Sequence, residues 1–229
     1  MPVALITGAS AGLGLAAARA LAERRCTLVI DARGEDALRT AAAELSAVTQ
    51  VAAIPGDVAD PAHRRELADA VAQAGQLDLL LNNASFLGPS PQPALADYPL
   101  DVLERVYQVG VFAPLALTQL LLPRLSETGV VVNISSDAAV EAYPGWGGYG
   151  SAKAALDHLT AILAAEHPRL GVYAFDPGDM RTAMHQAAFP DEDISDRPEP
   201  ETVVPALLRL IDDRPASGRL RASELAVPA

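Results

Sequence analysis

The chain has 229 residues, half of them hydrophobic, so we expect one globular domain over residues 1–229 with a single large core. Its formal net charge of −12 argues against nucleic acid and anionic membranes as partners, since both present phosphates that need a basic face. No unbroken apolar run reaches the roughly 18 residues of a membrane span, and no signal peptide precedes the first apolar run.

Short apolar runs alternate with longer amphipathic segments through the first part of the chain. We expect strands over residues 3–7, 28–32, 51–55 and 77–82, and helices over 13–25, 35–47 and 60–74. The third helix begins with Asp60 as its N-cap and Pro61 in its first turn. The single cysteine, Cys26, stands between a helix and a strand and cannot form an internal disulfide, which fits a reducing cytoplasm.

The same alternation continues to the end of the chain. Residues 86–99 contain four prolines and are expected to form a loop, followed by a long helix over 100–125 that Pro114 should kink. Strands are expected over 130–134 and 172–175 around a helix over 149–166. Residues 183–200 should form a mobile loop or short helix, 202–211 a last helix and 219–221 a short edge strand. Near-continuous apolar strands alternating with helices predict a doubly wound α/β Rossmann fold with a parallel sheet.

A glycine-rich segment joins the first strand to the first helix. Residues 7–14 read Thr-Gly-Ala-Ser-Ala-Gly-Leu-Gly. Glycines permit a tight turn and close approach of the backbone to a phosphate, and the helix N-terminus adds free N–H groups and a favourable dipole. This position in an α/β chain predicts the pyrophosphate site of a dinucleotide.

Five later segments follow in an order that resembles the short-chain dehydrogenase/reductase family. They are Asp57-Val58 after the third strand, Asn82-Asn83-Ala84 after the fourth, Asn133-Ile134-Ser135-Ser136 after the fifth, Tyr149-x-x-x-Lys153, and Asp176-Pro177-Gly178 with Thr182 after the sixth. Ser85 stands where the family usually has a glycine. The resemblance extends from Val3 to about Leu220. It implies an NAD(P)-dependent enzyme that interconverts a carbonyl and an alcohol.

The resemblance also implies a catalytic set of Ser136, Tyr149 and Lys153. Tyr149 and Lys153 share a helix face, and a nearby ammonium group lowers the pKa of a phenol. Ser136 has the family's spacing from the tyrosine, and Ser135 is the competing candidate. The implied cofactor contacts are Gly8, Ser10, Gly12, Leu13, Gly14, Arg33, Asp57, Val58, Asn83, Ala84, Tyr149, Lys153, Pro177, Gly178 and Thr182.

The end of the second strand bears on the choice between NADP(H) and NAD(H). An arginine can pair with the 2′-phosphate of NADP, whereas a carboxylate can accept from the ribose 2′-OH of NAD. Aligned on the family, Ala32 occupies the usual acidic position and Arg33 the basic position after it. Asp31 falls one residue early, where side chains point to the other face of the strand. We therefore favour NADP(H), with NAD(H) as the alternative.

One departure from the family pattern leaves the function open. Gly110 stands where the family usually has an asparagine that supports a helix irregularity and a water near the lysine. Glycine keeps the backbone carbonyl but loses the side-chain amide. Beside an active oxidoreductase, a lyase or isomerase without net redox and a non-catalytic NADP-binding sensor are therefore the alternatives.

Partners and substrate are less clearly indicated. The four histidines are scattered without metal-ligand spacing, so we expect no metal. The apolar face of residues 102–122 permits the homodimer or homotetramer that the family often forms. Residues 86–93, 137–146 and 180–189 should line the pocket of a small-molecule substrate, and within them Trp146 and Tyr143 hint at an apolar or aromatic one.

Overall fold

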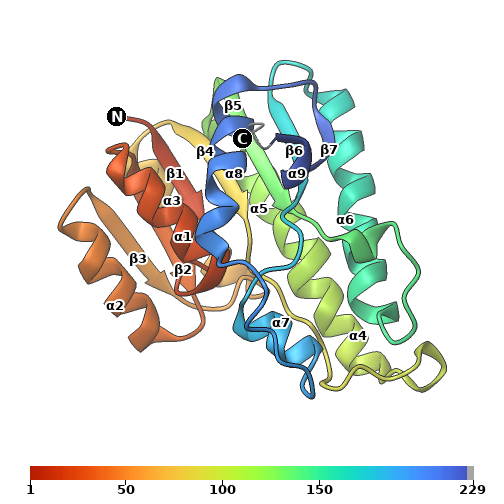
Figure 1. Ribbon diagram of the computed structural model, residues 1–229. Helices are drawn as coiled ribbons and strands as arrows, with labels where there is room; N and C mark the ends of the chain where they lie inside the picture. The colour runs from red at the N-terminus through yellow and green to blue at the C-terminus, as the bar shows by residue number, and fades with distance from the viewer. Residues whose placement is uncertain (226–229) are drawn as a thin grey trace.

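Seven parallel strands form the centre of the protein, in the order β3-β2-β1-β4-β5-β6-β7. The computed structural model describes residues 1–225 (Figure 1). The strands are β1 (Val3–Ile6), β2 (Thr27–Ala32), β3 (Val51–Pro55), β4 (Leu77–Asn82), β5 (Leu125–Ile134), β6 (Gly171–Asp176) and β7 (Gly218–Arg221). The predicted doubly wound α/β architecture is confirmed.

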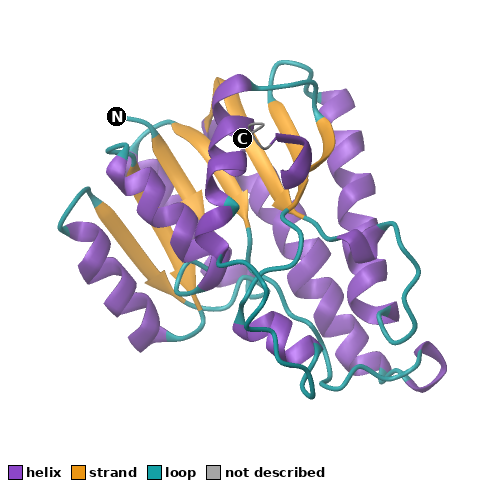
Figure 2. Ribbon diagram, viewed as in Figure 1, coloured by secondary structure: helices purple, strands orange, loops and turns teal. Residues whose placement is uncertain are grey.

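Helices cover both faces of this sheet (Figure 2). One layer contains α1 (Gly12–Glu23), α2 (Glu35–Ser46) and α8 (Val204–Asp213), and the other contains α3 (Pro61–Ala74), α4 (Leu100–Tyr107), α5 (Ala113–Leu121) and α6 (Gly147–Glu166). Two short helices, α7 (Ala183–Ala188) and α9 (Ala222–Leu225), follow β6 and β7. As predicted, α3 begins with Pro61, and the Asp60 side chain accepts a hydrogen bond from the Ala62 amide.

Strand β1 is apolar throughout because helices cover both of its faces. Ala4 and Ile6 pack into the layer with α1, whereas Val3 and Leu5 pack into the layer with α3. All four residues are buried. A strand covered on both faces has no solvent side, so the alternation of polar residues typical of half-exposed strands is lost.

The helix predicted over residues 100–125 is interrupted and ends one residue early. Residues Gln108–Phe112 form a π-helical turn, α5 then begins at Ala113, and Leu125 is already the first residue of β5. Pro114 lies in the first turn of α5 and cannot donate to the Gly110 carbonyl. The backbone therefore changes its hydrogen bonding in the turn before the proline.

This interrupted helix is also the one candidate membrane span among the described residues. By length and composition alone, Leu100–Arg124 is long and apolar enough, although half of its most apolar window is buried inside the protein. Leu117 and Leu121 pack against the sheet. A core helix passes the same test, and the packing of these leucines accounts for their apolar character.

Candidate active site

A cavity of about 410 Å³ runs along the carboxyl ends of the central strands. It opens where the strand order reverses, between β1 and β4, which is the usual ligand site of doubly wound folds. Most residues implied by the sequence meet in its lining: Gly8, Ser10, Gly12, Leu13, Arg33, Asp57, Val58, Asn83, Ala84, Ser136, Tyr149, Lys153, Pro177, Gly178 and Thr182. Gly14 is not part of the lining.

The glycine loop forms the floor of this cavity. Gly8 and Gly12 have φ angles of 67° and 55°, in the left-handed region that glycine adopts without strain. Gly14 serves close packing instead, because a Cβ there would lie 2.4 Å from the Gly8 carbonyl oxygen. The N-cap residue of α1, Ala11, offers no side-chain hydrogen bond, so the first amides of α1 suit an anion such as a pyrophosphate.

A buried carboxylate holds the glycine loop from behind. The Gly8 amide donates to Asp31 Oδ1 at 2.8 Å, and His63 Nε2 on α3 lies 2.9 Å from Asp31 Oδ2. Asp31 is 1% exposed and His63 is 4% exposed. Burial raises the pKa of Asp31, while the hydrogen bonds from His63 and Gly8 oppose the rise. Asp31 therefore has partners other than a ribose, and the sequence analysis missed the role of His63.

The end of β2 presents Arg33 to the cavity, with its side chain exposed, while Ala32 is buried. Across from it, Asp57 accepts a hydrogen bond from the Ala59 amide and pairs with Arg105. Although burial acts to raise the pKa of Asp57, the Ala59 hydrogen bond and the Arg105 and Arg33 charges bring it below its ordinary value. Arg33 is thus an available cation beside a carboxylate that is already paired.

Asn83 braces the glycine loop from β4. Its side-chain amide donates to the carbonyl oxygens of Thr7 and Gly8, at 2.9 and 3.1 Å. In return, the Thr7 hydroxyl accepts from the amides of Asn83 and Ala84. The ends of β1 and β4 are therefore tied together at the place where a pyrophosphate would bind.

Tyr149 and Lys153 lie at the other end of the cavity, on α6. The Lys153 ammonium donates to the Ile134 carbonyl oxygen at 2.6 Å and lies 5.4 Å from the centroid of the Tyr149 ring. Burial lowers the pKa of Lys153 to about 8. Burial also raises the pKa of Tyr149 to about 12, an effect opposed by the Ser85 hydroxyl, so the lowered phenol pKa expected from the nearby ammonium is not found. Ser85, where the family usually has glycine, is thus an additional hydroxyl beside the phenol.

The two neighbouring serines after β5 lie in different surroundings. Ser136 is half-buried on the cavity wall, and its hydroxyl donates to Asp137 Oδ1 at 3.0 Å. Ser135 is 2% exposed, and its hydroxyl lies near Asp157, where it helps to lower the pKa of a carboxyl that burial raises. Ser136 is therefore the serine whose hydroxyl can reach a ligand.

Arg219 of β7 connects three parts of the site, and the sequence analysis assigned it no role. Its guanidinium donates to the Ser136 carbonyl oxygen at 3.0 Å, to Asp176 Oδ2 at 2.7 Å and to Asp157 Oδ2 at 3.1 Å. Asp176 Oδ1 in turn accepts from the Gly178 amide at 3.0 Å. The edge strand thus fixes the loops that carry Ser136 and Gly178.

Gly110 faces α6 from the π-helical turn. A Cβ at this position would lie 3.7 Å from the Ala152 Cβ, which is ordinary contact distance. The helix irregularity is therefore present without the asparagine that the family usually has there.

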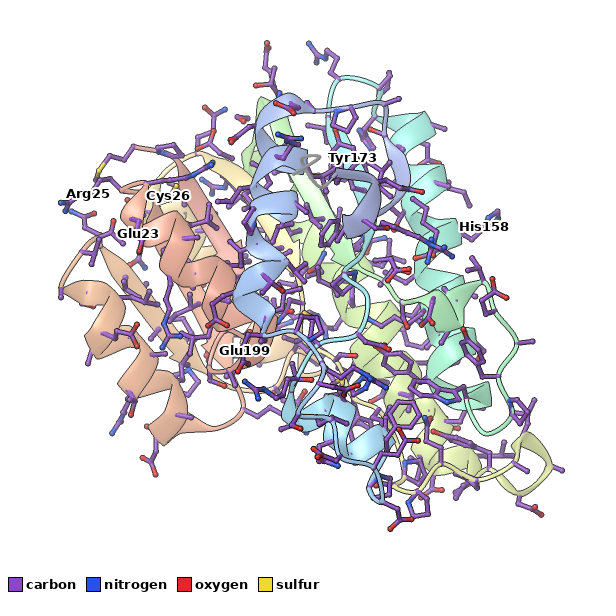
Figure 3. The ribbon with its side chains drawn as sticks, viewed as in Figure 1. Glu23, Arg25, Cys26, His158, Tyr173 and Glu199 are labelled. Atoms are coloured by element: carbon purple, nitrogen blue, oxygen red, sulfur yellow. The ribbon has the colours of Figure 1, made fainter. Side chains whose placement is uncertain are left out.

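Other candidate residues lie away from the cavity. Figure 3 shows Cys26 beside Glu23 and Arg25, at the opposite end of the molecule from α7, and His158 on the outer side of α6. Within residues 1–225, no three histidine, cysteine, aspartate or glutamate side chains gather as a metal-ligand set.

Known proteins resemble this chain over nearly its whole length. A model of the short chain dehydrogenase family matches residues 2–193. The protein named "Uncharacterized oxidoreductase YciK" of Escherichia coli is 34% identical over 219 residues, which are 92% of this chain and 86% of that protein. A short chain dehydrogenase structure from Shigella flexneri, complexed with NADP, is 31% identical with a TM-score of 0.89 and covers 97% of each chain. One from Escherichia coli, complexed with NADPH, is 32% identical with a TM-score of 0.88 and covers 96% of each chain.

Proposed function

The chain belongs to the short-chain dehydrogenase family of oxidoreductases, and we propose that it interconverts a carbonyl and an alcohol with NADP(H), using Ser136, Tyr149 and Lys153. One observation carries the proposal. A single cavity is lined both by the uncapped N-terminus of α1 and by Tyr149, and the Lys153 ammonium lies 5.4 Å from the centroid of the Tyr149 ring. A dinucleotide with its pyrophosphate at α1 would direct its nicotinamide end toward this phenol and ammonium, which are the only tyrosine and lysine among the described lining residues.

Each residue has a defined task in the proposed reduction. The Ser136 hydroxyl donates to the carbonyl oxygen of the substrate and orients it. Bound NADPH supplies a hydride, with its two electrons, to the carbonyl carbon and becomes NADP⁺. The Tyr149 hydroxyl gives its proton to the oxygen, so the product is the alcohol. Lys153 stabilises the resulting phenolate by its charge.

Several features support NADP(H) as the cofactor. Arg33 is free to meet a 2′-phosphate, whereas the Asp31 carboxylate is engaged by Gly8 and His63. The solved relatives from Shigella flexneri and Escherichia coli were complexed with NADP and NADPH. A guanidinium binds a phosphate through charge-assisted and often bidentate hydrogen bonds. These bonds add binding energy and also fix the orientation of the 2′-phosphate.

Replacing Arg33 by alanine should weaken the binding of NADPH and leave the binding of NADH nearly unchanged. A charge-assisted hydrogen bond contributes about 1.5–3 kcal/mol, so we expect the KM for NADPH to rise roughly tenfold to a hundredfold. The KM for NADH should change little, because NADH has no 2′-phosphate. Initial rates with each cofactor measure both. Arg39→Ala, at another exposed arginine in the i,i+4 pair with Glu35 on α2, is the matched control. Equal effects of Arg33→Ala on the two cofactors would contradict the assignment.

The pH dependence of the reduction rate should follow the loss of the proton from Lys153. The Tyr149 phenol, with a pKa of about 12, keeps its proton at neutral pH, whereas Lys153 loses its charge as the pH rises through about 8. The kcat for reduction should therefore be level at neutral pH and fall above about 8. In Lys153→Arg the guanidinium stays charged, so the overall rate drops but this descending limb should disappear. A limb with the same midpoint in both proteins would exclude Lys153 as its source.

A further inference from the structure

The part of the cavity beside the catalytic phenol has an aromatic wall. Trp146, the single tryptophan of the chain, packs edge-to-face on Tyr149 with ring centroids 5.8 Å apart. Phe189 lies behind Trp146 at 5.7 Å, and His185 lies against Phe189 at 4.9 Å. Apolar side chains of the cavity lining include Leu87, Met180, Met184 and Ala188. A flat ring entering this recess would meet Trp146, which lines the cavity and is itself packed against other aromatic side chains.

The charges fixed in this recess are acidic. Asp137 Oδ1 accepts from the Ser136 hydroxyl, and Oδ2 accepts from the Tyr143 hydroxyl, both at 3.0 Å. The carboxylate is thus held next to the hydroxyl that would orient the substrate. Asp179 lines the cavity as well.

The basic groups near the recess have other partners, and Arg219, outside the cavity lining, is paired with Asp157 and Asp176. Among the described residues that line the cavity, Arg33 and Lys153 are the only arginine and lysine. Arg33 lies at the distant β2 end, and Lys153 is directed to the Ile134 carbonyl oxygen. His185 Nδ1 lies 3.9 Å from Asp179 Oδ1. Arg197, outside the lining, is paired with Asp196 and lies 3.8 Å from Asp179.

We propose, on the basis of the function proposed above, that the substrate is an uncharged ketone whose carbonyl is attached to an aromatic ring. Trp146 selects the ring, and Asp137 rejects anionic substrates. An anionic group in the recess would meet the Asp137 carboxylate in a partly desolvated site, where like charges repel more strongly than in water. Ketones that carry a carboxylate, phosphate or sulfonate beside the ring are therefore poor substrates.

A matched pair of ketones tests the charge selection. Methyl para-acetylbenzoate and para-acetylbenzoate differ in one charge at the same ring position. We expect kcat/KM with NADPH to be at least about tenfold higher for the ester, which corresponds to about 1.4 kcal/mol. Asp137→Asn should bring the ratio close to one, and Asp191→Asn, at an exposed loop residue outside the cavity lining, should leave it unchanged.

A second pair tests the aromatic wall. Acetophenone and cyclohexyl methyl ketone present a flat and a puckered ring of similar size. The wild-type enzyme should prefer acetophenone severalfold, and Trp146→Leu should remove the preference. Trp146 fluorescence also reports binding without turnover, because the chain has no other tryptophan. The ester titrated into the complex with NADP⁺ should change this fluorescence at lower concentration than the carboxylate.

The outcomes separate this proposal from the function on which it rests. Equal reduction of ester and carboxylate, or an unchanged ratio in Asp137→Asn, would overturn the charge selection while leaving the oxidoreductase in place. A fluorescence change that favours the ester, without reduction of either ketone, would support the substrate class and contradict the proposed reaction. If neither ketone binds or reacts, the aromatic substrate class is wrong.

Discussion

Tyr149→Phe should lower kcat/KM for ketone reduction by about a thousandfold, within the range attributed to a positioned general acid. The variant keeps the ring that packs on Trp146 and lies near Lys153, and it loses only the hydroxyl. Without that hydroxyl, no proton reaches the oxygen as the hydride reaches the carbon. The affinity for NADPH should change less than about threefold, measured by quenching of Trp146 fluorescence.

Tyr107→Phe is the matched control for this experiment. Tyr107 ends α4 and packs against Phe112 with ring centroids 6.5 Å apart, outside the cavity lining. This variant should retain wild-type turnover. Full reductase activity in Tyr149→Phe would show that another group supplies the proton. If the wild-type protein binds NADPH tightly and consumes none with any ketone, a lyase, an isomerase or a non-catalytic sensor is favoured over an oxidoreductase.

Asp31→Ala should lower the free energy of unfolding by about 1–3 kcal/mol, the usual cost of leaving a buried hydrogen-bonding group without its partner. Asp31 is 1% exposed and is bound by both the Gly8 amide and His63. Alanine leaves these donors buried without an acceptor and releases the first turn of the glycine loop. The KM for NADPH should rise as well, because the loop amides lose their fixed positions. Urea denaturation and NADPH titration measure the two effects.

Two further variants separate the charge of Asp31 from its hydrogen bonds. Asp31→Asn keeps an oxygen acceptor for the Gly8 amide and should lose less stability than Asp31→Ala. Asp69→Ala removes an exposed carboxylate from α3, the helix that carries His63, and should change stability by under about 0.5 kcal/mol. A loss below about 1 kcal/mol in Asp31→Ala would contradict a stabilising role for the pair.

The fold could be predicted from local patterns because the strands obey them closely. Continuous apolar runs placed β1, β2, β3 and β4 within a residue of their observed bounds. The start of β5 was missed by five residues, since Leu125 pairs with Leu77 across an irregularity that precedes the regular register at Val130. The apolar pattern predicted only one helix kinked at Pro114, whereas the family resemblance pointed to a helix irregularity at Gly110, which lies inside the observed π-helical turn.

The site could be predicted only where its residues form contiguous motifs. The glycine loop and the Tyr149–Lys153 pair are local in sequence, so their spacing identifies them. The contact of Asp31 with His63 spans 32 positions, and that of Arg219 with Ser136 spans 83. No periodicity encodes such contacts. A carboxylate inside an apolar strand was nevertheless a signal, because a buried charge requires a partner.

The position of Arg219 has a consequence for substitutions at the edge of the sheet. Its guanidinium is shared by the Ser136 carbonyl and the Asp176 carboxylate, which follow two different strands. Arg219 itself is not part of the cavity lining. A substitution at this residue would therefore remove a common partner from two loops of the site at once without touching the cavity, so sensitivity to substitution can extend to a strand that meets no ligand.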